Sequence, residues 1–295
     1  MTTPTDTLIH ITDLHFWEVV KNPFALLNKR FLGNANVIYR RRKEFHMRQA
    51  EPYADHLASL GISECLIGGD FTSTATHAEY RMGRAFVDGL TRRGLNVHLM
   101  PGNHDVYTFE SVRARRFEHY FAGLAPDAGY PCALALPGGT PLILTPTVCP
   151  NYFSSAGRIT RAEAEATGAL VEAAPPGPVF VAGHYPILHR TASYTSPRSR
   201  QLRNAEALRT ALGETGRDIL YIAGHVHRFS FTRDARYPTL RHLTTGAFFL
   251  QRPGDACQGA FSTVSARADG FQVDWHSFDG AWSATRVDVA ADGAN

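Results

Sequence analysis

Five short apolar runs in this chain are each followed at once by a block containing aspartate, asparagine or histidine. The runs have the length of buried β-strands, and stretches with helical spacing lie between them. Polar residues just past the carboxyl ends of strands gather at one rim of an open α/β sheet, so these blocks are expected to meet in space. They are Asp13-Leu14-His15, Gly69-Asp70, Gly102-Asn103-His104-Asp105, Gly183-His184 and Gly224-His225-Val226-His227.

The spacing of apolar residues predicts strands that alternate with helices, and then a run of strands alone. The strands are expected at 8–11, 65–67, 97–100, 142–144, 179–181, 219–222, 239–243, 260–265 and 271–278. The helices are expected at 51–60, 78–93, 110–121, 160–174 and 204–212. This order favours an α/β fold with mixed sheets. Because no linker or internal repeat interrupts it, we expect one domain over 5–288 with an insertion at about 19–48.

Composition indicates a globular, cytoplasmic protein. Of the 295 residues, 44% are hydrophobic and 19% charged, which excludes disordered and fibrous classes. No apolar run approaches the ~18 residues of a membrane-spanning helix, and the first residues do not resemble a signal peptide. The four cysteines are widely scattered and favour a reducing compartment, where they would be small buried residues. They are Cys65, Cys132, Cys149 and Cys257.

The polar blocks together supply the ligand types of a site for two divalent metal ions. Aspartate oxygens and histidine nitrogens suit Mn²⁺, Fe²⁺ or Fe³⁺, and Zn²⁺ alike, so the residues do not select the metal. In an extended segment His225 and His227 point to the same side, because side chains alternate with period two. A single Asp-x-His or Gly-Asp is common by chance, whereas all five blocks in order are specific.

In this order the blocks resemble the D-x-H, G-D, G-N-H-D/E, G-H and G-H-x-H pattern of the calcineurin-like metallophosphoesterase superfamily. The resemblance runs from Asp13 to His227. It implies a four-layer α/β/β/α sandwich, in which helices flank two mixed β-sheets. It also implies an enzyme that hydrolyses a phosphoester or pyrophosphate bond by attack of a hydroxide bridging two metal ions.

The resemblance assigns nine residues to the site. The first metal ion would be bound by Asp13, His15 and His227, the second by Asn103, His184 and His225, and Asp70 would bridge the two. The phosphate would be contacted by His104, a histidine that binds no metal. Asp105 would orient the imidazole of His104.

Two departures from the family pattern leave the substrate open. Many relatives carry Asp or Asn where this chain has Ser73, and a second histidine where it has Tyr185. Ser73 weakens the case for a cyclic-nucleotide phosphodiesterase, which remains an alternative, and Tyr185 is interpreted as a wall of the pocket. A non-catalytic protein that keeps the fold for protein binding is the competing class. Of the remaining histidines, only His189 is a candidate for substrate contact.

A basic segment interrupts the chain after the first block. Residues 19–48 hold eight basic residues and one acidic residue, a net charge of +7 in a chain of +3. Phe24, Leu27, Phe31, Ala35 and Ile38 recur at the spacing of one helix face. A basic amphipathic helix is typical of a membrane-surface element. The alternatives are that its apolar face packs on the core, or that its charge attracts an anionic substrate.

If this segment contacts lipid, the substrate would be a phosphorylated or pyrophosphate-linked lipid. An insertion of this kind is similar to that of the UDP-2,3-diacylglucosamine pyrophosphatases within the superfamily. Nucleic acid ranks last among the partners, because no aromatic platform is interleaved with the charges. We therefore expect a cytoplasmic enzyme for a phosphorylated small molecule or lipid, with residues 19–48 as the part that would meet an anionic membrane.

Overall fold

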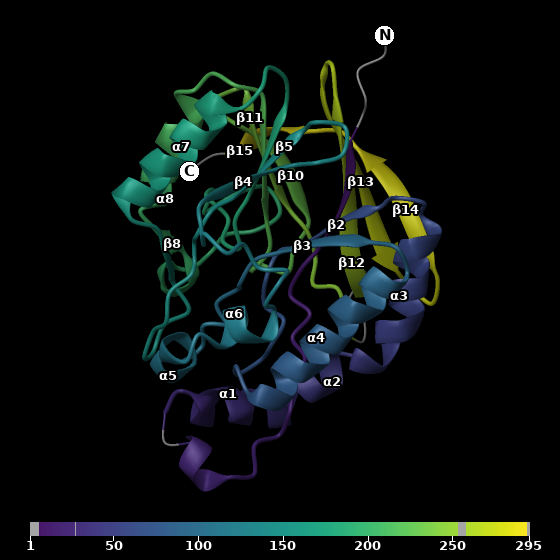
Figure 1. The fold of residues 1–295 in the computed structure, drawn as a ribbon, viewed down its shortest axis with the longest axis vertical. Helices are drawn as coiled ribbons and strands as arrows, with labels where there is room; N and C mark the ends of the chain where they lie inside the picture. The colour runs from purple at the N-terminus through teal and green to yellow at the C-terminus, as the bar shows by residue number, and fades with distance from the viewer. Residues whose placement is uncertain (1–5, 27, 253–257, 294–295) are drawn as a thin grey trace.

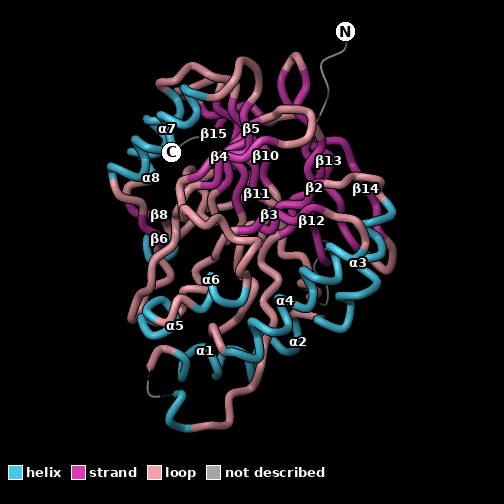
Figure 2. Tube along the Cα trace, in the orientation of Figure 1, coloured by secondary structure: helices cyan, strands magenta, loops and turns pink. Residues whose placement is uncertain are grey.

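The computed structural model describes residues 6–26, 28–252 and 258–293 (Figure 1). Leu27, Cys257 and the first residue of the expected domain lie outside them. Two large β-sheets pack face to face, and helices lie on their outer faces (Figure 2). This is the expected α/β/β/α sandwich. The domain limits 5–288 stay a prediction.

The first sheet carries the N-terminal blocks. Its strand order is β14-β13-β12-β1-β2-β3, and β1, β2 and β3 run parallel. The strands are β1 (Thr7–Ile11), β2 (Glu64–Ile67), β3 (Asn96–Leu99), β12 (Gln258–Arg267), β13 (Gly270–Phe278) and β14 (Trp282–Val287). Because β1, β2 and β3 are parallel, the three segments that follow them leave the sheet at the same edge.

The second sheet carries the C-terminal blocks. Its order is β15-β10-β11-β9-β7-β5-β4, with β5, β7, β9 and β11 parallel. The strands are β4 (Cys132–Ala135), β5 (Pro141–Leu144), β7 (Val179–Ala182), β9 (Ile219–Ala223), β10 (Ser230–Asp234), β11 (Leu240–Thr244) and β15 (Ala290–Gly293). Two short strands, β6 (Gly157–Arg158) and β8 (Leu202–Arg203), pair separately.

Side-chain alternation along the strands builds the layers. In β1, Leu8 faces the core between the two sheets, while Ile9 and Ile11 face the helices outside the first sheet. In β7, Phe180 faces the core between the sheets and Val181 faces the opposite side. These two strands therefore carry apolar side chains on both faces, as expected for strands in sheets that are covered on both sides.

Helices cover both outer faces. The first sheet is covered by α3 (Ala50–Ser59), α4 (His77–Arg92) and α6 (Arg116–Tyr120), and the second by α7 (Arg161–Ala173) and α8 (Ala205–Gly213). Thr76 and Glu79 form a capping box at the start of α4, which fixes where the helix begins. Among the described residues, no helix has the length and apolar character needed to cross a bilayer.

One expected helix is broken. In place of a helix at 110–121, the chain forms α5 (Phe109–Arg113) and α6, separated by Arg115 in a left-handed conformation with φ of 46°. The change of direction lets Phe117 and Phe121 reach the core. A left-handed arginine gives no signal in the sequence, because it is a rare conformation for this residue type.

The basic segment also differs from expectation. It forms a 3₁₀ turn (Pro23–Leu26), α1 (Arg30–Asn36), a π-helical turn (Val37–Arg41), α2 (Arg42–Glu44) and a 3₁₀ turn (Met47–Gln49). Phe24 and Phe31 are 78% and 62% exposed, so their packing on the core is excluded. The buried side of the segment holds Arg30, Asn34, Val37 and Arg41 instead.

Candidate metal centre

The structure brings all five polar blocks together. The blocks follow β1, β2 and β3 of the first sheet and β7 and β9 of the second. The first two blocks continue the parallel pairing beyond the strands, since the backbone N–H groups of Asp13 and His15 donate to the carbonyls of Gly69 and Asp70. The last two blocks come from the facing sheet. The site therefore lies where the carboxyl ends of strands from both sheets meet.

The backbone is held in an uncommon conformation at these blocks. Eight non-glycine residues among those described have positive φ, and five of them are expected metal ligands. These five are Asp13, His15, Asp70, His225 and His227, with φ between 49° and 68°. Left-handed conformations are unfavourable for such residues and gather at functional sites. The unfavourable backbone conformation of these five residues therefore sets the directions of their side chains.

Close approach of the loops explains one of the glycines. Gly69 has a φ of 99°, and a Cβ there would lie 2.5 Å from the backbone nitrogen of Gly102 and 2.9 Å from His184 Nδ1. Only glycine fits both the conformation and the space. The second and third blocks can consequently pack against each other, and Asp70 Oδ1 accepts a hydrogen bond from the backbone N–H of His104 at 2.7 Å.

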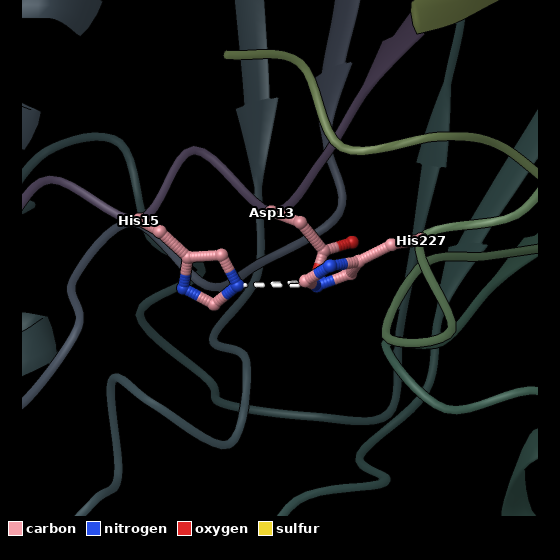
Figure 3. A group of neighbouring side chains, drawn as sticks. All are labelled: Asp13, His15 and His227. Carbon is pink, nitrogen blue, oxygen red and sulfur yellow. Dashed lines mark hydrogen bonds and ion pairs between the residues drawn. The ribbon is translucent and has the colours of Figure 1, made fainter. Parts of the chain in front are cut away.

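Asp13, His15 and His227 form one group of converging side chains (Figure 3). His15 Nε2 lies 3.2 Å from His227 Nε2 and 3.7 Å from Asp13 Oδ1, and His227 Nε2 lies 3.2 Å from Asp13 Oδ1. Asp13 and His15 are fully buried. His15 and His227 come from different sheets, so the group joins the two halves of the sandwich.

Asp70 connects this group to a second one. Its two oxygens point to different histidines, with Oδ2 lying 3.6 Å from His15 Nε2 and Oδ1 3.5 Å from His184 Nε2. Asn103 Oδ1 lies 3.2 Å from His184 Nε2 and 2.8 Å from His225 Nδ1. The second group therefore consists of Asp70, Asn103, His184 and His225.

These distances fit a pair of cation sites. Two ligand atoms that each lie ~2.1 Å from one ion at a tetrahedral angle are about 3.4 Å apart, close to the separations of 3.2–3.7 Å within the first group. Buried carboxylates without cations are costly, and Asp13 and Asp70 are both buried here. The donor set and its burial thus suit two divalent ions bridged by Asp70.

Electrostatics favour the neutral form of two of these imidazoles, those of His15 and His225, and the neutral form is the one that binds metal. Burial, together with the charge of Arg41, holds the pKa of His15 well below its ordinary value. Burial and the charge of His184 do the same for His225. His184 differs, because the charge of Asp70 and its hydrogen bond outweigh burial and raise its pKa to about 9.

His104 lies beside the metal ligands and converges with His15 and Asp70, with one ligand atom of each within 4.8 Å of the others. Its Nδ1 lies 2.7 Å from the carbonyl oxygen of Ser73, and its Nε2 lies 2.8 Å from Nη2 of Arg41. Its ring stacks on Tyr107 with 5.2 Å between centroids. The Ser73 carbonyl favours the tautomer with a proton on Nδ1. Ser73 thus fixes this histidine through its backbone.

Asp105 does not orient His104 as expected. Its carboxylate accepts hydrogen bonds from the backbone N–H groups of Phe71, Thr72 and Gly102, at 3.2, 2.9 and 2.8 Å, and from Thr72 Oγ1 at 3.1 Å. Burial and the charge of Asp70 raise its pKa to about 7. Asp105 therefore ties together the second and third blocks, while the imidazole of His104 turns toward Ser73 and Arg41.

A cleft of about 630 Å³ opens above the site. It is lined by Asp70, Asn103, His104, His225 and His227 and by six basic residues, which are Lys29, Arg40, Arg41, Arg200, Arg228 and Arg252. Glu44, which pairs with Arg40 and Arg252, also lines the cleft, so the basic side chains outnumber the acidic ones. Tyr185 is not a wall of it, since this residue is buried and its ring packs 4.0 Å from that of His225. His189 is absent from the described lining.

Sequence reasoning missed Arg41, Tyr107 and the carbonyl of Ser73. Arg41 belongs to a basic cluster in which no pattern distinguishes one residue from the next. Tyr107 follows the third block, but aromatic residues at that spacing are common in cores.

Comparison with known proteins identifies the family. Residues 7–229 match calcineurin-like phosphoesterases, which covers well over half of the chain. The chain belongs to this family. The predicted superfamily is thereby confirmed. A comparison with curated proteins finds no match.

Solved structures share the fold. A dimetal phosphatase from Danio rerio is 13% identical, with a TM-score of 0.58 over 98% of this chain and 100% of that one. Purple acid phosphatase PPD1 from yellow lupin seeds is 10% identical, with a TM-score of 0.60 over 99% of this chain and 55% of the other. A 5'-nucleotidase from Candida albicans is 15% identical, with a TM-score of 0.51 over 93% and 52%. At such identities the likeness concerns the fold.

Proposed function

We propose that this protein is a metal-dependent phosphoesterase with a dinuclear site. The observation that carries the proposal is the convergence of two ligand groups on the two oxygens of Asp70. The first ion would be held by Asp13, His15 and His227, and the second by Asn103, His184 and His225. Two such ions, when bound, activate water and neutralise the charge of a transferring phosphoryl group.

The protein's own residues position the substrate and handle its protons. His104 faces the cleft beside both ligand groups, within reach of a phosphoryl oxygen bound there. Because its Nδ1 donates to the carbonyl of Ser73, His104 would act on the departing oxygen through Nε2, which must then take up a proton in place of the hydrogen bond from Arg41. Stabilising or protonating the departing oxygen typically contributes ~10²–10⁴-fold to the rate. The basic lining of the cleft attracts an anionic substrate. A phosphate monoester, diester or pyrophosphate would meet this requirement.

Metal analysis and hydrolysis assays test the proposal. Metal content should approach two ions per chain, and a chromogenic phosphodiester or phosphomonoester should be hydrolysed with added Mn²⁺. His104→Ala should keep its metal and lose ~10²–10⁴-fold in kcat. The matched control is His119→Ala, which removes an exposed histidine outside the cleft. A well-folded protein that takes up no metal would sink the proposal, and one that binds metal but hydrolyses nothing would favour the non-catalytic class.

We further propose a substrate with a lipid portion, presented at an anionic membrane. All eight exposed large hydrophobic side chains in the described ranges belong to residues 24–39, 109–112 and 152–153. Lys29 Nζ donates to the carbonyl of Ser154 at 2.8 Å and the rings of Phe109 and Tyr152 are 4.5 Å apart, so these segments adjoin. Leu32 and Phe153 line the cleft itself. An apolar rim beside a positive cleft suits an amphiphilic phosphate ester.

Co-sedimentation with vesicles tests this second proposal. Vesicles of phosphatidylcholine with phosphatidylglycerol should bind the protein, and phosphatidylcholine alone should bind it much less. Phe24→Ser combined with Phe31→Ser, both exposed and outside the cleft lining, should weaken binding while leaving hydrolysis of a small water-soluble ester unchanged. Equal sedimentation of this variant and the wild type would contradict the proposal.

A further inference from the structure

The inserted basic segment sends one side chain into the candidate metal centre. Arg41 lies in the π-helical turn Val37–Arg41, where the backbone N–H of Arg42 bonds to the carbonyl of Val37, five residues back. Such turns are rare and frequent at functional sites. Arg41 is only 8% exposed, whereas Arg42 and Lys43 beside it are exposed. The segment therefore buries Arg41 while its basic neighbours Arg42 and Lys43 stay exposed.

Arg41 faces the residues proposed for chemistry, and the nearby charges of Asp70 and Asp13 act on it without a direct contact between the side chains being formed in the described ranges. Its Nη2 lies 2.8 Å from His104 Nε2, and its Nη1 lies 3.1 Å from His15 Nδ1 and 3.5 Å from the carbonyl of Ser73. Within the described part of the chain, no carboxylate forms an ion pair with it. A buried guanidinium with neutral partners is costly unless an anion completes its hydrogen bonds.

The contact between Arg41 and His15 also indicates that Arg41 needs an anion to complete its hydrogen bonds. If Nε2 of His15 binds metal, its Nδ1 carries the proton and donates to the carbonyl of Thr72, 3.3 Å away. Nη1 of Arg41 then faces the protonated Nδ1 of His15, which cannot accept its hydrogen bond. Since Nη2 points at His104, the two guanidinium nitrogens lie next to the place where His104 would meet a phosphoryl group.

We infer that Arg41 binds two oxygens of the substrate's phosphoryl group, so that the inserted segment completes the active site. Arginine suits this role because its planar fork matches phosphate oxygens in pairs. The inference rests on the proposed metal centre. It assigns the inserted segment a part in catalysis that is separate from any contact with lipid.

Phosphate binding tests the inference without relying on turnover. Wild type, Arg41→Gln, Arg41→Lys and the control Arg48→Gln are loaded with Mn²⁺ until metal analysis gives equal contents, and titrated with inorganic phosphate in a calorimeter. Arg41→Gln should weaken phosphate binding about 10- to 100-fold. Arg41→Lys should lie between it and the wild type, because lysine keeps the charge without the fork. Arg48 is exposed in the same segment, and its variant should match the wild type.

The outcomes separate this inference from the proposed function. If Arg41→Gln and Arg41→Lys hold full metal and bind phosphate within twofold of the wild type, the inference is wrong, even if the protein is a phosphoesterase. If the wild type hydrolyses no ester but phosphate affinity still falls in Arg41→Gln, the inference stands and the proposed function fails. Arg41→Lys decides the matter by the same criterion if Arg41→Gln does not fold.

Discussion

Asp105 shows how a residue inside a recognised block can have a different part from the one its block indicates. It lies next to His104 in the chain, and its side chain points the opposite way, into a ring of N–H donors from Phe71, Thr72 and Gly102. Residues 103–106 form a turn, closed by hydrogen bonds from the N–H groups of Asp105 and Val106 to the carbonyl of Gly102, and neighbouring side chains leave this turn in different directions. The block gives the residue types, while the direction of each side chain depends on the loop that packs against it.

Substitution of Asp105 should therefore affect the metal ligands more than the phosphate contact. Asp105→Asn puts an NH₂ group against backbone donors, which loosens the loop that carries Asp70. Loss of a supporting hydrogen bond behind metal ligands typically costs ~10–100-fold in metal affinity. Competition with a chelator should detect this. Asp127→Asn, an exposed substitution, serves as the control, and unchanged metal affinity in Asp105→Asn would refute the supporting role.

At the residue scale, the ligand types and their order could be predicted from sequence, and their convergence is what the structure adds. Arg41 could not have been selected, because its neighbours Arg40 and Arg42 have the same chemistry. What distinguishes Arg41 is its place in a π-helical turn, which has no known signature in the residues themselves.

At the element scale, the inserted segment inverts the expected amphipathic pattern. The apolar side chains of Phe24 and Phe31 face outward, and Arg30 is buried. Its guanidinium donates to the carbonyls of Thr74 and Ala75 at 3.0 and 3.2 Å and pairs with Glu110 at 3.0 Å. The spacing of apolar residues predicts that one face of the helix is apolar. Which face packs on the domain depends on a distant loop, here on the carbonyls of Thr74 and Ala75.

Arg30 should therefore anchor the inserted segment to the domain. Arg30→Met removes the hydrogen bonds to Thr74 and Ala75, of which only the Ala75 carbonyl keeps a second donor, Arg116, so residues 19–48 should detach locally. We expect cleavage by trypsin within this segment to accelerate about tenfold or more, since each lost kcal/mol of local stability raises the open population about fivefold. Metal content should change little.

Lys21→Met provides the control, because it removes a charge from an exposed position of the same segment. Equal cleavage rates within 19–48 for Arg30→Met and the wild type would show that Arg30 does not hold the segment in place.

At the scale of the whole molecule, nine strands could be predicted from their apolar runs, and several strands near the sheet edges could not. The expected strands became β1, β2, β3, β5, β7, β9, β11, β12 and β13. The missed ones include β4, β10, β14 and β15, all of which lie at or next to a sheet edge. In β14, residues 283–286 are exposed, so apolar alternation is weak there.

The tightly packed sandwich also buries ionisable groups away from the site, and these set its pH stability. His242 of β11 is fully buried, its ring stacks on Tyr221, and neither of its nitrogens has a hydrogen-bond partner among the described residues. Burial lowers its pKa to about 3, with Asp234 opposing and His189 adding to this effect. In the unfolded chain the pKa returns to ~6.5.

His242 should make the protein less stable as the pH falls below ~6.5. Between this value and the folded pKa of about 3, the unfolded chain binds a proton that the folded protein does not, so unfolding is favoured by ~1.4 kcal/mol per pH unit. His242→Phe keeps an aromatic ring and removes the proton acceptor. Urea unfolding from pH 7 to pH 5 should give a slope against pH that is smaller in this variant. His119→Phe, at an exposed position, should keep the wild-type slope; parallel curves for His242→Phe and the wild type would rule out His242 as the source.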